Sequence, residues 1–131
     1  MIGTNNPGNL RNSFSIMWKG QTGQTRGFCD FDTLDDGARA LCIDLKNAQV
    51  MHDLNTIATI IPHYAPPNEN DTEAYITSVC ADMGLDRNES LDLTQQWTLA
   101  SLASAVWHHE QGQTPDNTAI DYGVAAAMAE A

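Results

Sequence analysis

Apolar residues recur every three or four positions through most of the chain after Thr33, which predicts a mainly α fold. Thr33 and Asp36 resemble the capping box at the start of a helix, and helical spacing continues as far as Ala48. The same criteria predict further helices at residues 55–63, from Asp71 or Thr72 to Gly84, from a Thr94 cap to Glu110, and at residues 118–129. Residues 66–70, which include two prolines, predict a rigid break.

The residues before Thr33 are rich in asparagine, glycine, glutamine and serine, with isolated aromatic side chains. Residues 17–20 and 27–31 are predicted to form two short strands around a turn at residues 21–26. Phe28 and Phe31 depart from the strict alternation of a half-buried strand. The sequence therefore predicts a small β-hairpin near the N-terminus in addition to the helices. No repeat and no linker divides residues 1–131, which indicates a single domain.

Composition excludes several function classes. The net charge is −11 and the few Lys and Arg residues form no cluster, so we expect neither nucleic acid nor an anionic membrane surface as a partner. No stretch approaches the roughly 20 apolar residues of a membrane span, and the start of the chain is not a signal peptide. We expect synthesis in a reducing cytoplasm.

The cysteines and histidines do not form a typical metal site. Cys29, Cys42 and Cys80 are odd in number and widely spaced, which predicts buried free thiols. His108-His109-Glu110 resembles part of a zinc helix, but no second histidine follows at the required spacing, so we expect neither metal nor cofactor. A cysteine–histidine nucleophile pair remains an alternative, although no cysteine lies in electropositive sequence.

Glu110 is the candidate catalytic residue. Steps of three and four residues back from it reach Val106 and Leu102, so it lies at the edge of a core-facing stripe, just before a glycine that can end the helix. Burial against Trp107 would disfavour the charged carboxylate and so favour a general acid for a glycosidic oxygen. The alternative is a solvated residue in the last turn, although that end of the helix dipole is unfavourable for an anion.

Two polar regions could line a groove beside Glu110. Residues 5–11, Asn-Asn-Pro-Gly-Asn-Leu-Arg, can aim side-chain amides at sugar hydroxyls, but the same residue types also build ordinary turns. Tyr64 and Tyr75 could orient a carboxyl acid or stabilise a sugar intermediate, whereas Tyr75 also fits a core position beside Val79.

Together these segments resemble a group of bacteriophage and prophage virion proteins, with an N-N-P-G-N-[IL]-R start, a G-F-x-x-F segment and a late H-E-x-G-Q. The resemblance extends over residues 5–113. More distantly, the blocks resemble the flagellar-type glucosaminidases of the lysozyme superfamily, in which the catalytic helix precedes the asparagine turn. Here that helix comes last, so the resemblance implies a circularly permuted, lysozyme-like single domain, which is possible because domain termini often lie close together.

The resemblance also implies roles for individual residues. Glu110 matches the family's acid, Asp30 or Asp32 lies where some relatives place a second carboxylate, and Tyr64 or Tyr75 matches the cleft tyrosine. The implied substrate-binding residues are Asn5, Asn6, Trp18 and Tyr75. Two departures are Gln111 in place of the family's serine and Pro7-Gly8 in place of Phe-Gly.

The implied function is cleavage of peptidoglycan glycan strands, as a muramidase, glucosaminidase or lytic transglycosylase. The protein would be made in the host cytoplasm, carried in the virion with other virion proteins and act in the periplasm or cell wall. Without a facing second carboxylate, a transglycosylase route to an anhydro sugar is favoured. If Asp30 or Asp32 faces Glu110, a separation of about 5 Å favours retention and about 6.5–9.5 Å favours inversion.

Two alternatives remain. One is a non-catalytic phage structural or glycan-binding protein on the same frame, which the acidic composition favours, and the other is a toxin-like effector with the same chemistry. If the protein is an enzyme, we expect a groove beside Glu110 lined by asparagine, tyrosine and the hairpin. If it is a non-catalytic protein, we expect Glu110 to be exposed, or to pair with Arg11 or Arg39 without a groove.

Overall fold

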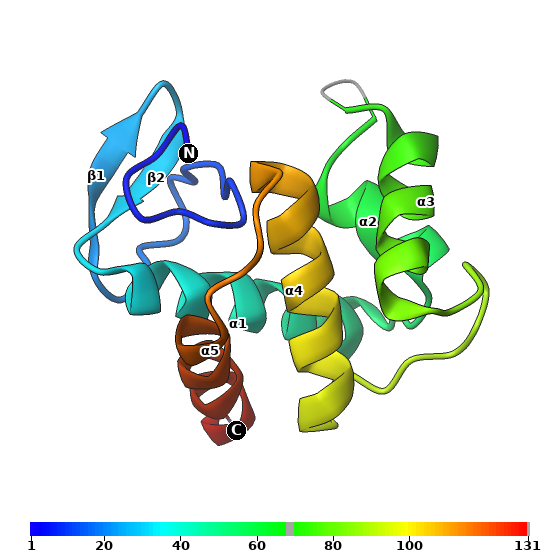
Figure 1. Ribbon diagram of the computed structural model, residues 1–131. Coiled ribbons are helices and arrows are strands. Elements are labelled where there is room, and N and C mark those ends of the chain that lie inside the picture. Colours follow the sequence, from blue (N-terminus) through cyan, green and yellow to red (C-terminus); the bar gives the residue numbers. More distant parts are fainter. Residues whose placement is uncertain (68–69, 131) are drawn as a thin grey trace.

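The computed structural model describes residues 1–67 and 70–130 (Figure 1). The described residues form a two-stranded sheet and five helices: β1 Gln21–Thr25, β2 Phe28–Phe31, α1 Leu34–His52, α2 Ile57–Tyr64, α3 Thr72–Met83, α4 Gln96–Gln111 and α5 Asn117–Ala129. The prediction of a mainly helical chain with a small hairpin near the N-terminus is confirmed.

Several helix boundaries follow from local capping. The Thr33 hydroxyl accepts a hydrogen bond from the Asp36 backbone N–H at 3.1 Å and begins α1, and Asp71 caps α3 in the same way. Gly84 and Gly112 end α3 and α4 with φ angles of 68° and 65°, a left-handed conformation that glycine adopts without strain. These predicted boundaries are confirmed.

The predicted cap at Thr94 is wrong. Gln95 precedes α4 without a side-chain cap, and the Thr94 hydroxyl donates instead to the Asp92 carboxylate at 2.5 Å. The short helix α2 begins after a Thr56 capping box and extends through Tyr64, one residue beyond its predicted end. The predicted break at residues 66–70 includes Asn68 and Glu69, which lie outside the described residues.

The hairpin is present, but its first strand is not where the pattern placed it. β1 covers most of the predicted turn, and the turn itself is Arg26-Gly27, with φ angles of 53° and 84°. Two consecutive positive φ angles match the right-handed twist of a two-residue hairpin. β1 is largely exposed and polar, so no apolar alternation marks it in the sequence.

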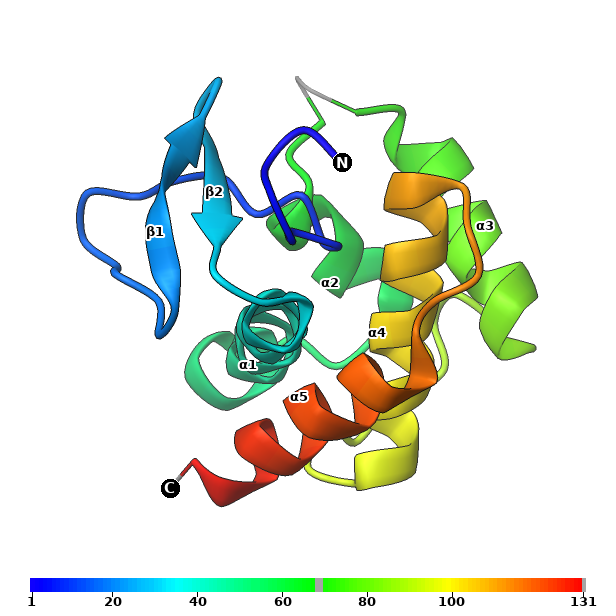
Figure 2. The same ribbon diagram turned by 60° about the vertical axis from the view of Figure 1, so that its left-hand side comes forward.

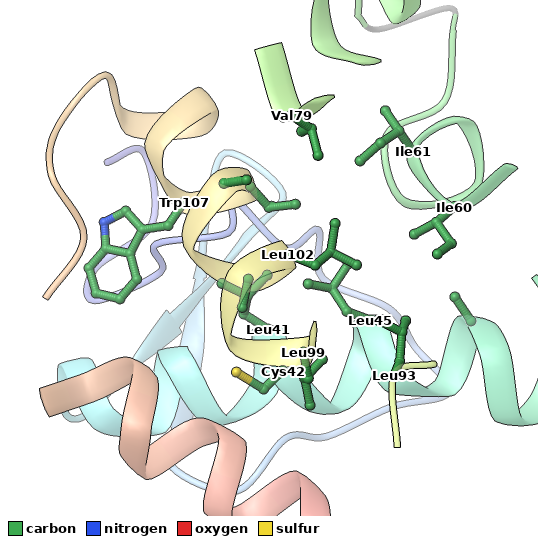
Figure 3. Close-up of a cluster of buried hydrophobic side chains, with 14 of the residues drawn as sticks. Leu41, Cys42, Leu45, Ile60, Ile61, Val79, Leu93, Leu99, Leu102 and Trp107 are labelled. Atoms are coloured by element: carbon green, nitrogen blue, oxygen red, sulfur yellow. The ribbon is translucent and has the colours of Figure 1, made fainter. Parts of the chain in front are cut away.

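The main core forms where α1 packs against α2, α4 and α5, with α3 covering α2 and α4 (Figures 1 and 2). Figure 3 shows the buried side chains that meet there: Leu41 and Leu45 of α1, Ile60 and Ile61 of α2, Val79 of α3, and Leu99 and Leu102 of α4. α5 packs along α1 and closes the opposite face. In the described part of the chain, no helix has the length and apolar character required to cross a membrane.

A second, smaller apolar cluster joins the N-terminal segment and the hairpin to α1. Its buried members are Leu10, Cys29, Phe31 and Ala40. Trp18 and Tyr64 pack against both this cluster and the main core, so they connect the hairpin side of the molecule to α2. The N-terminal segment is thereby held over α1 and beside the end of α4 (Figure 2).

The two tryptophans of α4 provide a matched test of the core. Trp107 is 3% exposed, whereas Trp97 is 81% exposed. We expect Trp107→Ala to lower the free energy of unfolding by about 3–5 kcal/mol, because the cavity cannot fully collapse. Trp97→Ala should change it by less than about 0.5 kcal/mol. Urea unfolding followed by circular dichroism measures both, and equal losses would show that the buried face of α4 is misassigned.

Candidate functional site

A rigid N-terminal turn forms one wall of the site. Asn5 and Asn9 have φ angles of 53° and 48°, a left-handed conformation that asparagine tolerates better than most residues. The fully buried Asn6 side chain donates to Leu10 O and Cys29 O, both at 3.0 Å, and accepts from the Leu10 N–H at 2.9 Å. All of its polar atoms are thus used within the protein, as burial requires.

The structure does not bring the predicted substrate-binding residues Asn5 and Asn6 to a surface groove. The Asn5 amide donates to Phe31 O and Asp32 O at 3.2 Å each, so both asparagines tie the turn to β2 or its end. The start of α1 passes close by: a Cβ on Gly37 would lie 1.8 Å from Asn5 O. These residues determine the shape of the turn and leave its last asparagine, Asn9, to face the site.

The end of α4 docks on this turn, so segments 101 residues apart meet (Figure 2). The Gln111 amide donates to Pro7 O at 2.9 Å and to Asn9 Oδ1 at 3.1 Å. Asn9 Nδ2 in turn donates to Glu110 Oε1 at 2.9 Å. Because the Asn9 oxygen is engaged by Gln111, its NH₂ group is directed at the Glu110 carboxylate.

Tyr75 of α3 holds the other oxygen of Glu110. Its hydroxyl donates to Glu110 Oε2 at 2.7 Å, and its ring stacks on His109 with centroids 3.8 Å apart. Burial, with the nearby Glu110 carboxylate, raises the pKa of Tyr75, so the hydroxyl stays a neutral donor. Glu110 is half-buried, and its orientation is determined by neutral groups from two separate elements.

A groove of about 480 Å³ opens beside Glu110. The N-terminal segment contributes Asn9, Leu10, Arg11, Ser13 and Ile16, and the hairpin region contributes Trp18 and Phe28. From the helical side come Asp44 of α1 and residues 63–66 at the end of α2. The groove thus combines carboxyl groups, an amide and aromatic side chains, a composition typical of small-molecule binding sites.

Tyr64 and Trp18, both predicted site residues, line this groove and are half-buried. The Tyr64 hydroxyl donates to Gly8 O at 2.5 Å, and a Cβ on Gly8 would lie 2.3 Å from that hydroxyl. Glycine is therefore required here for the turn to approach α2. Burial, followed by the neighbouring Tyr75, raises the pKa of Tyr64 well above its usual value, so Tyr64 also stays neutral.

Asp30 and Asp32, the predicted second carboxylates, do not line the groove. Asp30 accepts hydrogen bonds from the Thr4 N–H at 2.7 Å and from the Thr25 hydroxyl at 2.8 Å. The Thr4 N–H, and next the Thr25 hydroxyl, hold the pKa of Asp30 below its usual value. Asp30 therefore ties the chain start to the hairpin, while Asp32 is exposed at the end of β2.

Sequence reasoning missed three residues of the site: Asn9, Gln111 and Asp44. Asn9 belongs to the asparagine-rich segment, but its spacing did not distinguish it from Asn5 and Asn6. Gln111 lies next to Glu110 and was noted only as a departure from the family pattern. Asp44 carries a usable signal, because it interrupts the apolar stripe of α1 between Leu41 and Leu45.

The cysteines do not support nucleophilic chemistry. Burial raises the pKa of the Cys42 thiol to about 12 and also raises the pKa values of Cys29 and Cys80, which disfavours the reactive thiolate. Within residues 1–67 and 70–130, no three histidine, cysteine or acidic side chains gather as metal ligands would.

Comparison with known proteins gives one informative relative. The chain is 33% identical over 115 residues to Protein P5 of Pseudoalteromonas phage PM2, an alignment that spans 85% of this chain and 70% of that protein. No family model matches the chain.

The buried amide of Asn6 can be tested by a nearly isosteric change. Asn6→Asp replaces a donor by a charged acceptor opposite two carbonyl oxygens, so we expect the free energy of unfolding to fall by about 3 kcal/mol or more. The exposed Asn117 is the matched control, and Asn117→Asp should stay within about 0.5 kcal/mol. If urea unfolding gives the same stability for both variants, the turn does not depend on Asn6.

Proposed function

The chain belongs to the family of Protein P5 of Pseudoalteromonas phage PM2, and we propose that it cleaves the glycan strands of peptidoglycan with Glu110 as the general acid. The observation that carries this proposal is a half-buried carboxyl group, oriented by neutral donors on both oxygens, at the wall of a groove. A general acid must hold its proton within reach of the leaving oxygen, and fixed orientation is the main requirement for that transfer.

The chemistry begins when protonated Glu110 gives its proton to the glycosidic oxygen and the bond from that oxygen to the sugar carbon breaks. The resulting carboxylate is stabilised by the Tyr75 hydroxyl and the Asn9 amide, which already point at its two oxygens. Trp18 and Tyr64 provide aromatic surface on which sugar rings can pack. The bond cut can be that of a muramidase or a glucosaminidase, and the product a reducing or an anhydro sugar.

A circularly permuted, lysozyme-like frame is part of the same proposal. Its support is the junction at which the late helix α4 docks on the early turn through Gln111, Asn9 and Glu110. In such an arrangement the acid keeps its place beside the turn even though the order of the segments along the chain is changed.

The second candidate is a non-catalytic glycan-binding protein of the virion. The net charge of −11 favours it, because an acidic protein is repelled by the anionic wall polymer. Two features favour the enzyme instead: the groove beside Glu110, and the pairing of Arg39 with Glu130 at 3.2 Å rather than with Glu110. For either candidate we propose a place in the virion beside other virion proteins and action in the periplasm or cell wall.

The direct test is Glu110→Gln on purified sacculi. This change removes the transferable proton but keeps the shape of the side chain, so release of soluble muropeptides should fall at least about 100-fold while the melting temperature changes little. Glu89→Gln, at an exposed position, is the matched control and should retain wild-type activity. Fragment masses distinguish reducing from anhydro ends. Wild-type release by Glu110→Gln would remove Glu110 from the mechanism, and binding without release by the wild type would favour the second candidate.

Tyr75→Phe tests the orientation of the acid. The variant keeps the ring stacked on His109 but loses the hydrogen bond to Glu110, so kcat should fall about 10- to 100-fold with KM nearly unchanged. Tyr122→Phe, on the exposed side of α5, is the control. A rise in KM at constant kcat would instead assign Tyr75 to substrate binding.

A further inference from the structure

Asp44 of α1 is a carboxylate with no role in the mechanism proposed for Glu110. It lines the same groove as Glu110 and is only partly exposed. Within the described part of the chain, its carboxylate accepts no hydrogen bond and forms no ion pair, whereas Glu110 is bonded at both oxygens. Asp44 and Glu110, the acidic groups among the described residues of the groove, are therefore held in different ways.

The position of Asp44 is unfavourable for the stability of the fold. It occupies the apolar stripe of α1, where neighbouring positions on the same face are Leu41, Leu45 and Ala48. A half-buried carboxylate without a hydrogen-bond donor loses hydration that the fold replaces only in part. Such a residue is better explained by contact with a ligand or with the solvent of the groove.

The surroundings of Asp44 suit a proton acceptor. Burial raises the pKa of Asp44, and the nearby His63 and His52 lower it in part. His63 also lines the groove, and its ring lies 4.7 Å from that of His52. The two histidines thus offset burial in part and favour the charged form of Asp44, which is the form that can accept a proton from a water molecule.

The carboxylates of Asp44 and Glu110 both lie near Tyr64. Asp44 and Glu110 both lie close enough to raise the pKa of Tyr64, and all three side chains line the groove. Glu110 comes from α4 and Asp44 from α1, so the groove presents acidic groups from two elements. Glycoside hydrolysis uses two carboxyl groups that flank the bond to be cut.

We propose that Asp44 is the second carboxylate of this groove and accepts a proton from the water that attacks the sugar. The inference rests on the proposed function, with Glu110 as the acid. Glu110 protonates the glycosidic oxygen as its bond to the sugar carbon breaks. The water oxygen bonds to that carbon, and the proton it loses goes to Asp44. One water is consumed, a new reducing end forms, and the proton on Asp44 returns to Glu110 through solvent.

This role determines the products. If Asp44 directs water to the face opposite the leaving group, cleavage of a β-1,4 linkage gives a reducing end that is first formed as the α-anomer. An anhydro sugar requires attack by a hydroxyl group of the substrate itself and has no use for Asp44. The inference therefore assigns hydrolysis with inversion to this groove.

The experiment compares the wild type with Asp44→Asn and Asp44→Ala on purified sacculi and on soluble glycan strands prepared from them. Asp121→Asn, at an exposed position of α5, is the matched control. We expect the wild type to release fragments with reducing ends. NMR should show that each new reducing end is first formed as the α-anomer. Asp44→Asn should be at least about 100-fold slower, with a melting temperature no lower than that of the wild type.

Rescue of cleavage by sodium azide distinguishes a catalytic role of Asp44 from a purely structural one. In Asp44→Ala, azide can occupy the space of the missing carboxylate and attack the sugar carbon without a base. We expect it to restore cleavage at least 10-fold and to give an α-glycosyl azide, with no rescue of Glu110→Gln. Wild-type activity in Asp44→Asn, anhydro ends from the wild type, or no azide product would each overturn the role of Asp44. No release by the wild type would instead overturn the proposed function.

Discussion

The side-chain amide of Asn9 connects the two ends of the chain, because its oxygen accepts from Gln111 and its nitrogen donates to Glu110. This arrangement depends on the shape of the turn before it, which the buried Asn6 amide holds through three hydrogen bonds. A change in that turn would move the donor that faces Glu110. The orientation of the carboxyl group is therefore a property of the whole junction between the turn and α4, and not of its helix alone.

Glu110 and Asp44 are held differently in the described part of the groove, and the reason is the donors around each. Glu110 lies where the N-terminal turn and α3 both offer neutral donors, so its geometry is fixed. Asp44 lies on the apolar stripe of α1 and receives no hydrogen bond from the residues that the structure describes, so its oxygens remain available in the groove. One group is fixed in orientation and the other keeps its oxygens free in the groove, which suits the roles of acid and base proposed for them.

Much of the helical frame could be predicted because its signals are local. Thr33, Gly84 and Gly112 each act through their own backbone neighbourhood, and their effects are visible in the sequence. The first strand could not be predicted, since its residues are polar, exposed and paired only with β2. For the site, Glu110 and the tyrosines followed from spacing and resemblance. The choice of Asn9 over Asn5 and Asn6 depends on the hydrogen bonds that tie the other two asparagines to β2 or its end, and the choice of Asp44 over Asp30 depends on which helix face meets the groove.

The central claim is that the junction between the turn and α4 builds a glycan-binding groove beside Glu110. The most direct measurement is an NMR titration of the Glu110→Gln variant with soluble glycan fragments, which uses the indole signals of Trp18 and Trp97 as reporters. Trp18 lines this groove, whereas Trp97 lines a separate hollow along α4 and the start of α5. The account predicts saturable shifts of the Trp18 indole and of the Asn9 side-chain amide, with the Trp97 indole unchanged. Shifts at Trp97 alone, or no shifts at millimolar glycan, would contradict it.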